Sequence, residues 1–548
     1  MTEKEIESFF NQKVYPHFVK YLKSKETYIS WLFFTGDYAY KIKRPVKFSY
    51  LDFSSLPKRK YFLEEELRLN RRISRDIYLD VVPIIKRGSR IKILESSIFS
   101  LPPKAKIIDY ALKMREIPEK YYMPVLIKKG KIRKYQIDKI AKIVADFHKK
   151  AGLAPELKKF DFLKIVEKNW EENFKNVKNF TGETIRKPIF YFIKRKVKSF
   201  LKENKKLFKE RQKSGKIKDC HGDLHANNIF ITPPKVQIID CIEFNKRFRF
   251  GDTVSDVAFL SMDLEFLNRE DLADYFIKRY IFWSKDAAIL KFLDFYKCYF
   301  TFVKGKVANF SLKIHPVKSR KAGTQSLFTK RAGLVNRVNN PEEKKKEAER
   351  YFSLAFKYAV NFSKSPPFLI VICGNIGTGK SYLTKHLQAL TGFSRLQSDV
   401  IRKKTFEIPP FSRKKEKINQ GIYDKGAIRG VYEKMIDAAF PILSKNKSVI
   451  LDATFAKKIF RDKVIVLAKK IKVPYIFIEC QLSEKIILER LKKRKKEKEV
   501  SDADIYTYFK KKKEFEPIKI SKAHYLGINT NFPISLQLDR ILKRLLTP

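Results

Sequence analysis

The sequence predicts a mixed fold, α+β in the first part of the chain and α/β in the last. Residues 25–115 alternate short apolar runs with turn residues, and residues 135–310 have mostly helical periodicity. Two consecutive prolines, Pro366 and Pro367, interrupt the helical pattern before a new apolar strand, because proline cannot continue a helix. We therefore expect a first domain over residues 1–362, a linker at 363–367 and a second domain over 368–548.

Local patterns predict the elements of the first domain. Ile6, Phe9, Phe10 and Val14 recur at helical spacing and predict an amphipathic helix at the start. Alternating apolar runs around turn residues predict strands, and a charged stretch without Gly or Pro predicts a helix. The expected strands are 29–34 and 38–42, paired in a hairpin, then 81–85 and 91–94, paired in a second hairpin, and 107–114; the helix is 58–73.

Length and composition exclude several classes of protein. The chain has 548 residues, 44% of them apolar, which is too long for a single small module and too apolar for a disordered chain. Its start lacks the apolar core of a signal peptide, and no stretch approaches the roughly 18 apolar residues of a membrane span. We expect a cytoplasmic protein with no membrane partner. The five cysteines form no CxxC pair, so neither a disulfide framework nor a zinc ribbon is indicated.

The formal net charge of +58 raises the question of a nucleic-acid partner. Residues 367–548 carry 39 Lys and Arg against 18 Asp and Glu, and the other 366 residues carry 79 against 42. A nucleic-acid arm would concentrate this charge, whereas an even background suits a solvated surface. Nucleic acid is therefore an alternative partner and not the favoured one.

A phosphate-binding motif begins the second domain. An apolar strand at 368–373 precedes Gly374-Asn375-Ile376-Gly377-Thr378-Gly379-Lys380-Ser381, and a helical stretch follows, so GxxxxGKS stands in its strand, loop, helix setting. The backbone N–H groups of such a loop face phosphates, Lys380 reaches the β- and γ-phosphates, and Ser381 can ligate Mg²⁺. A glycine-rich turn without a ligand is the alternative. The motif predicts ATP and Mg²⁺ as cofactors, bound by Gly374, Gly377, Thr378, Gly379, Lys380 and Ser381.

Three further features of the second domain fit phosphoryl transfer. Asp452 ends the apolar strand 448–451 and could hold the Mg²⁺ shell, with an aspartate in a turn as the alternative. Asp399 could accept the proton of an acceptor hydroxyl while Arg402, three residues on, binds the substrate; a helix cap and surface pair is the alternative. Arg490 and Arg494, four apart, could close over the transferred phosphoryl group or belong to a solvated basic helix.

These features together resemble P-loop kinases and ATPases of the zeta-toxin, gluconate-kinase and polynucleotide-kinase group. The resemblance spans most of residues 368–515 and implies a P-loop domain with a parallel sheet. It implies that Asp399 and Arg402 form the acceptor site and that Asp452 is the strand-end carboxylate. Arg490 and Arg494 match the lid of that group. The acceptor varies across the group and is not implied.

A second motif lies in the first domain, at Cys220-His221-Gly222-Asp223-Leu224-His225-Ala226-Asn227-Asn228-Ile229. Asp223 and Asn228 follow His221 at the spacing of the catalytic loop H-R-D-L-x-x-x-N, in which the Asp accepts the hydroxyl proton and the Asn binds a metal. Asp240 ends the next apolar strand, where a second metal-binding carboxylate is expected, although no DFG is present. There are two alternatives: a metal-hydrolase cluster of His221, His225, Asp223 and Asp240, and a purely structural loop.

Lys41 lies late in the first predicted hairpin, as the lysine of V-A-I-K does. Three acidic residues, Glu64, Glu65 and Glu66, lie on the next predicted helix. Lys41 could hold the α- and β-phosphates of ATP and pair with one of these glutamates. A lysine on an edge strand is the alternative.

HGDLHxxNI followed by IID resembles the aminoglycoside-phosphotransferase and choline-kinase branch of the protein-kinase fold, over residues 25–265. The resemblance implies a two-lobed domain in which Asp223 is the catalytic base, Asn228 and Asp240 hold Mg²⁺, and Lys41 contacts ATP. The chain departs from the kinase pattern because no G-x-G-x-x-G precedes Lys41. The segments TYISWLFFTGDYAYKIKRPVKFSYLDFS, EEELRLNRR and CHGDLHANNI, followed by a P-loop kinase, resemble a bacterial family of fused phosphotransferase-like and P-loop proteins over nearly the whole chain.

The sequence therefore predicts a kinase with two sites, each transferring the γ-phosphoryl group of Mg-ATP to a hydroxyl of a small-molecule acceptor. One alternative is a regulatory ATPase whose first domain binds a ligand without catalysis, which the missing glycine-rich loop favours. Another is a nucleic-acid end kinase in the second domain, which would use the basic background to bind phosphates.

Overall fold

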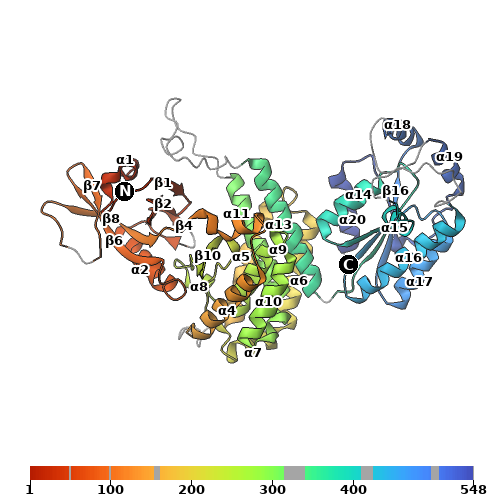
Figure 1. Cartoon of the computed structure of the whole chain (residues 1–548). Coiled ribbons are helices and arrows are strands. Elements are labelled where there is room, and N and C mark those ends of the chain that lie inside the picture. The colour runs from red at the N-terminus through yellow and green to blue at the C-terminus, as the bar shows by residue number, and fades with distance from the viewer. Residues whose placement is uncertain are drawn as a thin grey trace. The chain divides into compact units, whose positions relative to one another are not determined.

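The computed structural model describes residues 1–48, 51–97, 100–152, 161–313, 340–363, 365–408, 424–494 and 505–546 (Figure 1). The chain divides into two compact units, Met1–Asn179 with Phe200–Tyr351, and Phe180–Ser199 with Phe352–Pro548. The linker expected at 363–367 stays a prediction. In the described part of the chain, no helix combines the length and the apolar character needed to cross a lipid bilayer.

The first unit begins with a six-stranded antiparallel sheet in the order β1-β2-β3-β8-β6-β7. Both predicted hairpins are present, as β2 with β3 and β6 with β7. Figure 1 shows α2 (Leu56–Asn70) running along the sheet, where it packs against β6 and β8. The strands are β1 (Lys23–Glu26), β2 (Ser30–Phe34), β3 (Tyr38–Lys43), β6 (Tyr78–Arg87), β7 (Arg90–Ile93) and β8 (Lys106–Arg115), with a separate pair β4 (Lys47–Phe48) and β5 (Leu51–Asp52).

The amphipathic start forms one short helix, α1 (Glu3–Glu7), and two turns of 3₁₀ helix, so the single long helix expected there is wrong. The break lies at Asn11, whose backbone is extended and whose side chain accepts a hydrogen bond from the N–H of Lys13. Asparagine competes in this way for backbone donors and so ends helices. Phe9 and Val14 are still buried against the sheet, as the pattern predicted.

Side chains of β3 alternate between two layers, because successive residues of a strand face opposite sides. Tyr40 and Ile42 pack with the N-terminal segment. Ala39 packs on the other side with Leu63 of α2. Lys41 and Lys43 share the face of Ala39 and reach toward α2.

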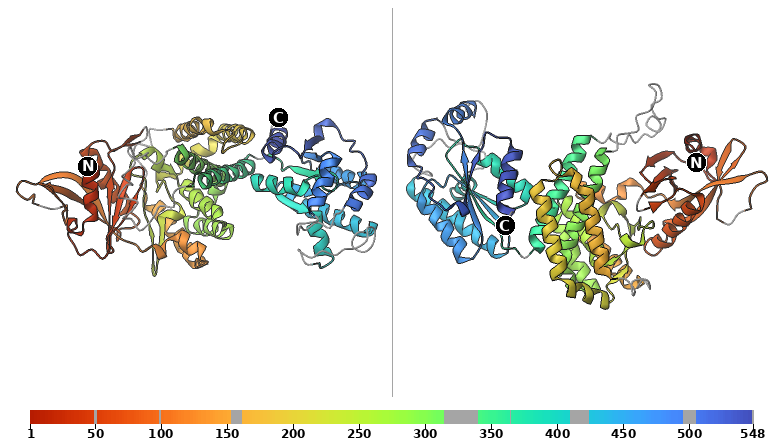
Figure 2. Two further views of the ribbon diagram at one scale, coloured as in Figure 1. Left: turned by 90° about the horizontal axis from the view of Figure 1, so that it is seen from above. Right: turned by 180° about the vertical axis from the view of Figure 1, so that it is seen from behind.

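The rest of the first unit is mostly helical, and α4, α9 and α10 run side by side in Figures 1 and 2. Strand β9 (Ile217–Asp219) pairs with β12 (Phe250–Asp252), and β10 (Ile229–Thr232) pairs with β11 (Lys235–Ile238). A strand-containing lobe followed by this helical lobe is the two-lobed, protein-kinase-like architecture that the sequence predicted. The helices are α3 (Met123–Lys128), α4 (Lys134–Lys150), α5 (Phe162–Val177), α7 (Lys205–Lys213), α8 (Lys246–Arg249), α9 (Thr253–Phe266), α10 (Glu270–Ser284) and α11 (Leu293–Lys313).

The second unit is built on a five-stranded parallel sheet in the order β14-β15-β13-β16-β17, as expected for a P-loop domain. Helices α16 and α17 bury apolar residues against β13, β15 and β16. Helices α14 and α20 contact each other beside β15 and β17, and Figure 1 shows them across the sheet from α16 and α17. The strands are β13 (Leu369–Cys373), β14 (Ser394–Gln397), β15 (Val449–Asp452), β16 (Tyr475–Gln481) and β17 (Tyr525–Asn529). The helices are α14 (Lys380–Thr391), α15 (Ser398–Thr405), α16 (Lys425–Ser444), α17 (Lys458–Lys470), α18 (Glu484–Arg494), α19 (Ile505–Glu514) and α20 (Ile534–Leu546).

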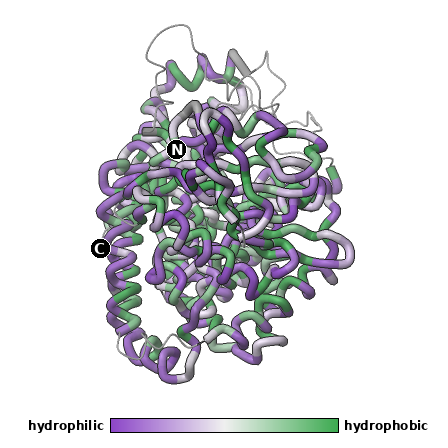
Figure 3. Tube along the Cα trace, turned by 90° about the vertical axis from the view of Figure 1, so that its left-hand side faces the viewer, coloured by the Kyte–Doolittle hydropathy of each residue, from purple (hydrophilic) through white to green (hydrophobic). Residues whose placement is uncertain are grey.

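Two of the three boundaries between the units fall within α-helices. These helices are α6 (Lys187–Glu203) and α13 (Pro341–Phe362). In Figure 3, hydrophilic and hydrophobic residues alternate along most of the described trace. This is the pattern of elements that each bury one face and leave the other in water.

Candidate active sites

A buried aspartate on α9 holds the loop that carries Asp223. The carboxylate of Asp256 accepts hydrogen bonds from the backbone N–H of His221 at 2.8 Å and of Gly222 at 2.9 Å. His148 of α4 lies 3.0 Å from the same carboxylate, and its other ring nitrogen lies 2.8 Å from the hydroxyl of Tyr280. Because these groups are buried, the loop has few alternative positions. No sequence pattern singled out Asp256 or His148.

His221 and Gly222 shape the start of this loop. The Nδ1 of His221 accepts from the N–H of Asp223 at 3.3 Å, and its Nε2 lies 3.0 Å from the carbonyl of Ile239. Burial lowers the pKa of His221, which favours the neutral ring that both contacts need. Gly222 has φ +82°, and a Cβ there would lie 3.0 Å from the carbonyl oxygen of Phe248. Glycine is therefore required by both conformation and space.

Asp223 and Asn228 lie together, as the spacing of the motif predicted. The Nδ2 of Asn228 donates to the Asp223 carboxylate at 3.1 Å and to the Asp223 carbonyl at 3.0 Å. The Nε2 of His225 lies 3.3 Å from the same carboxylate, while its Nδ1 accepts from the N–H of Asn227. Burial alone would raise the pKa of Asp223, but His225 and Lys304 outweigh it and lower that pKa to about 2. Asp223 is therefore ionised at neutral pH.

Asp240 lies beside this pair. The N–H of Ile239 donates to the carbonyl of Asn228 at 2.9 Å, which places Asp240 next to Asn228. Asp240 has φ +68°, a left-handed conformation that few residues other than glycine adopt. Its N–H donates to the hydroxyl of Tyr78 at 3.0 Å. A constrained conformation of this kind is often found at functional sites.

Lys41 joins Asp240 to α2. Its Nζ lies 2.7 Å from Oε1 of Glu66 and 2.8 Å from Oδ1 of Asp240. Glu66 is thus the partner among the three candidate glutamates, since Glu64 and Glu65 pair with other basic residues on the outside of α2. The alternative of an edge-strand lysine is wrong, because β3 lies between β2 and β8.

Sequence analysis missed two residues that extend this set. The Nζ of Lys43 lies 2.9 Å from Oε2 of Glu66 and 2.5 Å from Oε1 of Glu243. Burial alone would raise the pKa of Glu66, but Lys41 and Lys43 lower it to about 2. Burial raises the pKa of Glu243, against the opposing effect of Lys43. We call the five residues Asp240, Lys41, Glu66, Lys43 and Glu243 the charge ladder.

The second site is the loop between β13 and α14. The Nζ of Lys380 donates to the carbonyl of Asn375 at 2.8 Å, and burial lowers the pKa of this lysine. The hydroxyl of Thr378 donates to the same carbonyl at 2.8 Å. Gly374 has φ +131°, and a Cβ there would lie 2.7 Å from the carbonyl oxygen of Cys480. The loop therefore folds tightly around Asn375, with Lys380 turned into it.

Gly377 and Gly379 also have positive φ, and Gly379 faces α18. A Cβ on Gly379 would lie 3.3 Å from a guanidinium nitrogen of Arg490. Arg490 also donates to the carbonyl of Thr530 at 3.3 Å. The structure thus places Arg490 at the phosphate loop, while the side chain of Arg494 lies outside the described part of the chain.

Asp452 is paired in this structure. Its Oδ2 accepts from the hydroxyl of Thr384 at 2.8 Å and from Arg395 of β14, with the Nε at 3.1 Å. Ser381 lies in the first turn of α14 with its side chain exposed. The Mg²⁺ role of Asp452 and Ser381 stays a prediction, and for Asp452 it requires that the ion compete with Arg395.

Asp399 and Arg402 form an ion pair within α15, with the guanidinium Nη1 2.7 Å from Oδ1 of Asp399. Asp399 is half exposed, whereas Arg402 is mostly buried. The charge of Arg402 lowers the pKa of buried Tyr432, and the charge of Asp399 raises it. The charge of Asp399 also acts to raise the pKa of Lys380, against the effect of burial. The pair therefore lies near the phosphate loop, while its role in binding an acceptor stays a prediction.

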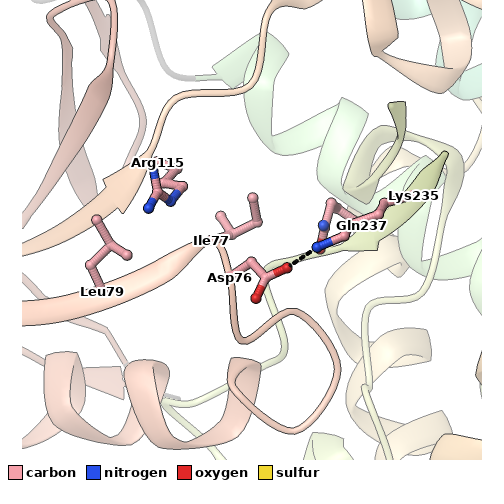
Figure 4. Close-up of a pocket in the computed structure, with 6 residues that line it drawn as sticks. All are labelled: Asp76, Ile77, Leu79, Arg115, Lys235 and Gln237. Atoms are coloured by element: carbon pink, nitrogen blue, oxygen red, sulfur yellow. Dashed lines mark hydrogen bonds and ion pairs between the residues drawn. The ribbon is translucent and has the colours of Figure 1, made fainter. Parts of the chain in front are cut away.

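Two other features of the first unit contain none of the predicted site residues. The first is a shallow pocket that no predicted site residue lines. Figure 4 shows Asp76 and Lys235 paired at this pocket, with Arg115 and Gln237 nearby. Within the described residues, the group with the spacing of metal ligands is His148, Cys220 and Asp256, whose histidine and aspartate already hold the loop. The metal-hydrolase alternative had used other residues, and its His221 makes backbone contacts with both ring nitrogens.

Comparison with known proteins gives one family match. Residues 369–518 match the family model of an AAA domain. This range contains the phosphate loop, Asp399, Asp452 and Arg490. The match thus falls on the part of the chain that contains the phosphate loop and four of the five strands of the parallel sheet.

Similar proteins were found along most of the chain. Uncharacterized proteins of Mycobacterium tuberculosis and Mycobacterium bovis are 25% identical to it over 471 residues, which is 86% of this chain and 86% of theirs. A choline/ethanolamine kinase family protein from Mesorhizobium loti is 13% identical, covers 65% of this chain and 99% of its own, and has a TM-score of 0.37. A putative kinase from Chloroflexus aurantiacus is 18% identical, covers 33% of this chain and 97% of its own, and has a TM-score of 0.28.

Proposed function

We propose that the chain is an ATP-dependent phosphotransferase with two sites, each transferring the γ-phosphoryl group of Mg-ATP to a hydroxyl of a small-molecule acceptor. The observation that carries this proposal is the assembly of Lys41, Glu66, Asp223, Asn228 and Asp240 from separate parts of the first unit. The sequence motifs named four of these residues and gave Glu66 as one of three candidate glutamates. The five residues belong to one connected set of short contacts. The phosphate loop and the AAA domain match support the second site.

In the first site, Asp223 would hold the acceptor hydroxyl and accept its proton during transfer. Asp223 is ionised, and its carboxylate is oriented by Asn228 and His225. Lys41 would bind the phosphates of ATP. The lysine is held by Glu66, so its position does not depend on the nucleotide.

The donor set of the first site fits Mg²⁺. Magnesium prefers carboxylate and amide oxygens, and Asp240 and Asn228 provide both. Because Nδ2 of Asn228 donates to Asp223, its Oδ1 is the atom left to ligate a cation. The carboxylate of Asp240 is 44% exposed and can be reached. When bound, the ion would supply positive charge that stabilises the charge of the transferring phosphoryl group.

In the second site, the backbone of the phosphate loop and Lys380 would bind the phosphates, and Arg490 would lie against them from α18. The partial burial of Lys380, which lowers its pKa, supports this, because a bound phosphate would offset the cost of removing the lysine charge from water. Asp399 is proposed as the base and Arg402 as the substrate contact. Ser381 and Asp452 are proposed to hold Mg²⁺.

The test is an acceptor screen with γ-labelled ATP on the full chain, using sugars, amino alcohols and 5′-hydroxyl oligonucleotides. We expect Asp223→Asn to remove one labelled product and Lys380→Ala to remove a different one. Asp274→Asn and Lys385→Ala, which change exposed residues of the same units, are the matched controls. If label appears only on oligonucleotide ends, the second site is a nucleic-acid end kinase, and if no variant changes any product, the proposal is wrong.

A further inference from the structure

The charge ladder and the chain segment 240–243 together form a closed ring that includes Lys41 and Asp240 of the first site. Its charges alternate in the order Asp240, Lys41, Glu66, Lys43 and Glu243, and each neighbour is joined by an ion pair of 2.5 to 2.9 Å. The two ends of the ladder, Asp240 and Glu243, are three residues apart in the chain. The ladder therefore attaches one short segment, residues 240–243, to β3 at both of its ends.

The inner half of the ladder is buried. The side chains of Lys43 and Glu66 are 0% exposed and that of Glu243 is 5% exposed, and the Nζ of Lys43 lies 4.6 Å from the ring centre of Phe53. A buried charge is tolerated only when it is paired, so Lys43 depends on Glu66 and Glu243 together. Lys43 has no access to a nucleotide from this position. Lys43 instead contacts two carboxylates. One is that of Glu66, which also pairs with Lys41, and the other is that of Glu243, which follows Asp240 by three residues.

Each contact of Lys43 constrains a different member of the site. The contact with Oε2 of Glu66 fixes the carboxylate plane, so that Oε1 faces Lys41. The contact with Glu243 holds the far end of residues 240–243 and so limits the movement of Asp240. Asp240 has a left-handed backbone, which needs such support from its surroundings.

We propose that Lys43 and Glu243 are a positioning ion pair that keeps Asp240 in place to ligate the Mg²⁺ of the first site. This inference rests on the proposed function of that site. Residues that hydrogen bond or pair with a metal ligand typically contribute roughly tenfold to a hundredfold to metal affinity. Removing the pair should therefore weaken the metal-dependent part of nucleotide binding.

The test measures binding of a non-hydrolysable ATP analogue by titration calorimetry over a range of Mg²⁺ concentrations. The full chain carries Lys380→Ala throughout, so that the second site does not contribute. The variants are Lys43→Met, Glu243→Gln and the two combined, with Asp240→Asn as the reference for loss of the ligand. Lys60→Met, which changes an exposed lysine of α2, is the matched control. Glu243→Gln keeps the side-chain volume and carries the test if Lys43→Met does not fold.

We expect Lys43→Met and Glu243→Gln each to raise the Mg²⁺ concentration for half-maximal binding by about tenfold or more. The combined variant should add little to either, because both remove the same pair. When a chelator replaces Mg²⁺, the affinity for the ATP analogue should be the same in Glu243→Gln, in the control and in the parent chain. A purely structural role would lower binding equally with and without Mg²⁺, and that result would overturn the inference.

Failure of the inference can be separated from failure of the proposed function. If Asp240→Asn abolishes the Mg²⁺ dependence while Glu243→Gln leaves it unchanged, the first site binds Mg-nucleotide and the positioning role is wrong. If the chain with Lys380→Ala binds no nucleotide at any Mg²⁺ concentration, the proposed function of the first site is wrong and the inference fails with it.

Discussion

The substitution Glu66→Gln tests whether the charge ladder stabilises the first unit. It keeps the shape of the side chain and removes the one charge that faces both Lys41 and Lys43. The pKa of Glu66 falls from 4.5 to about 2 in the folded chain. Each pKa unit is worth about 1.4 kcal/mol, so the carboxylate contributes roughly 3 kcal/mol at neutral pH. Breaking a buried ion pair from one side costs about the same, roughly 3 to 5 kcal/mol.

Urea unfolding followed by tryptophan fluorescence measures this loss. The three tryptophans, Trp31, Trp170 and Trp283, all belong to the first unit, so their signal reports on that unit. Glu64→Gln is the matched control, because Glu64 lies on the exposed side of the same helix. We expect Glu66→Gln to lower the free energy of unfolding by about 3 kcal/mol at pH 7 and Glu64→Gln to leave it unchanged.

The pH dependence has a defined sign. The folded pKa of Glu66 lies below its unfolded value, so its contribution is complete above pH 4.5 and is lost as the pH falls toward 2. The difference between the wild-type chain and Glu66→Gln should therefore already be smaller at pH 4 than at pH 7. If Glu66→Gln and Glu64→Gln unfold at the same urea concentration at pH 7, the ladder does not stabilise the first unit and the reasoning is refuted.

Three further changes have defined outcomes. In a chain that also carries Asp240→Asn, which removes Mg²⁺-dependent binding at the first site, Gly374→Ala should abolish the remaining Mg²⁺-dependent nucleotide binding, because its Cβ would lie 2.7 Å from a carbonyl oxygen. Gly430→Ala, whose Cβ meets nothing within 4 Å, should leave that binding unchanged. His225→Phe should raise the pKa of Asp223 from about 2, because it removes a group that lowers this pKa. On acidification, the variant should therefore lose first-site turnover at a higher pH than the wild-type chain does. Tyr432→Phe should lower the stability of the second unit by about 1 to 3 kcal/mol in scanning calorimetry, because the hydroxyl that contacts Thr454 and the N–H of Phe455 is buried.

Local patterns were sufficient to predict the residues that belong to short motifs. The spacing of Asp223 and Asn228 placed them in one loop, and their side chains are hydrogen bonded. The strand, loop, helix setting of the phosphate loop is also as predicted. The pairing of Lys41 with one of three glutamates followed from hairpin and helix order, although only the packing of α2 on the sheet selects Glu66.

Residues that act across long distances in the sequence were missed. Lys43 lies two residues after Lys41 and so on the same face of β3, which is a signal that strand periodicity could have supplied. Glu243 and Asp256 carry no such signal, because their partners lie on other elements and are brought close only by folding. The pairing of Asp452 with Arg395 joins two neighbouring parallel strands, and the order of those strands could not be read from the sequence.

The most direct test of the two-site account is the transfer of label from γ-labelled ATP by the full chain and its two site variants. The account predicts two labelled products, of which Asp223→Asn removes one and Lys380→Ala removes the other. Loss of both products in Lys380→Ala, with none lost in Asp223→Asn, would show a single active site in the second unit and would contradict the account.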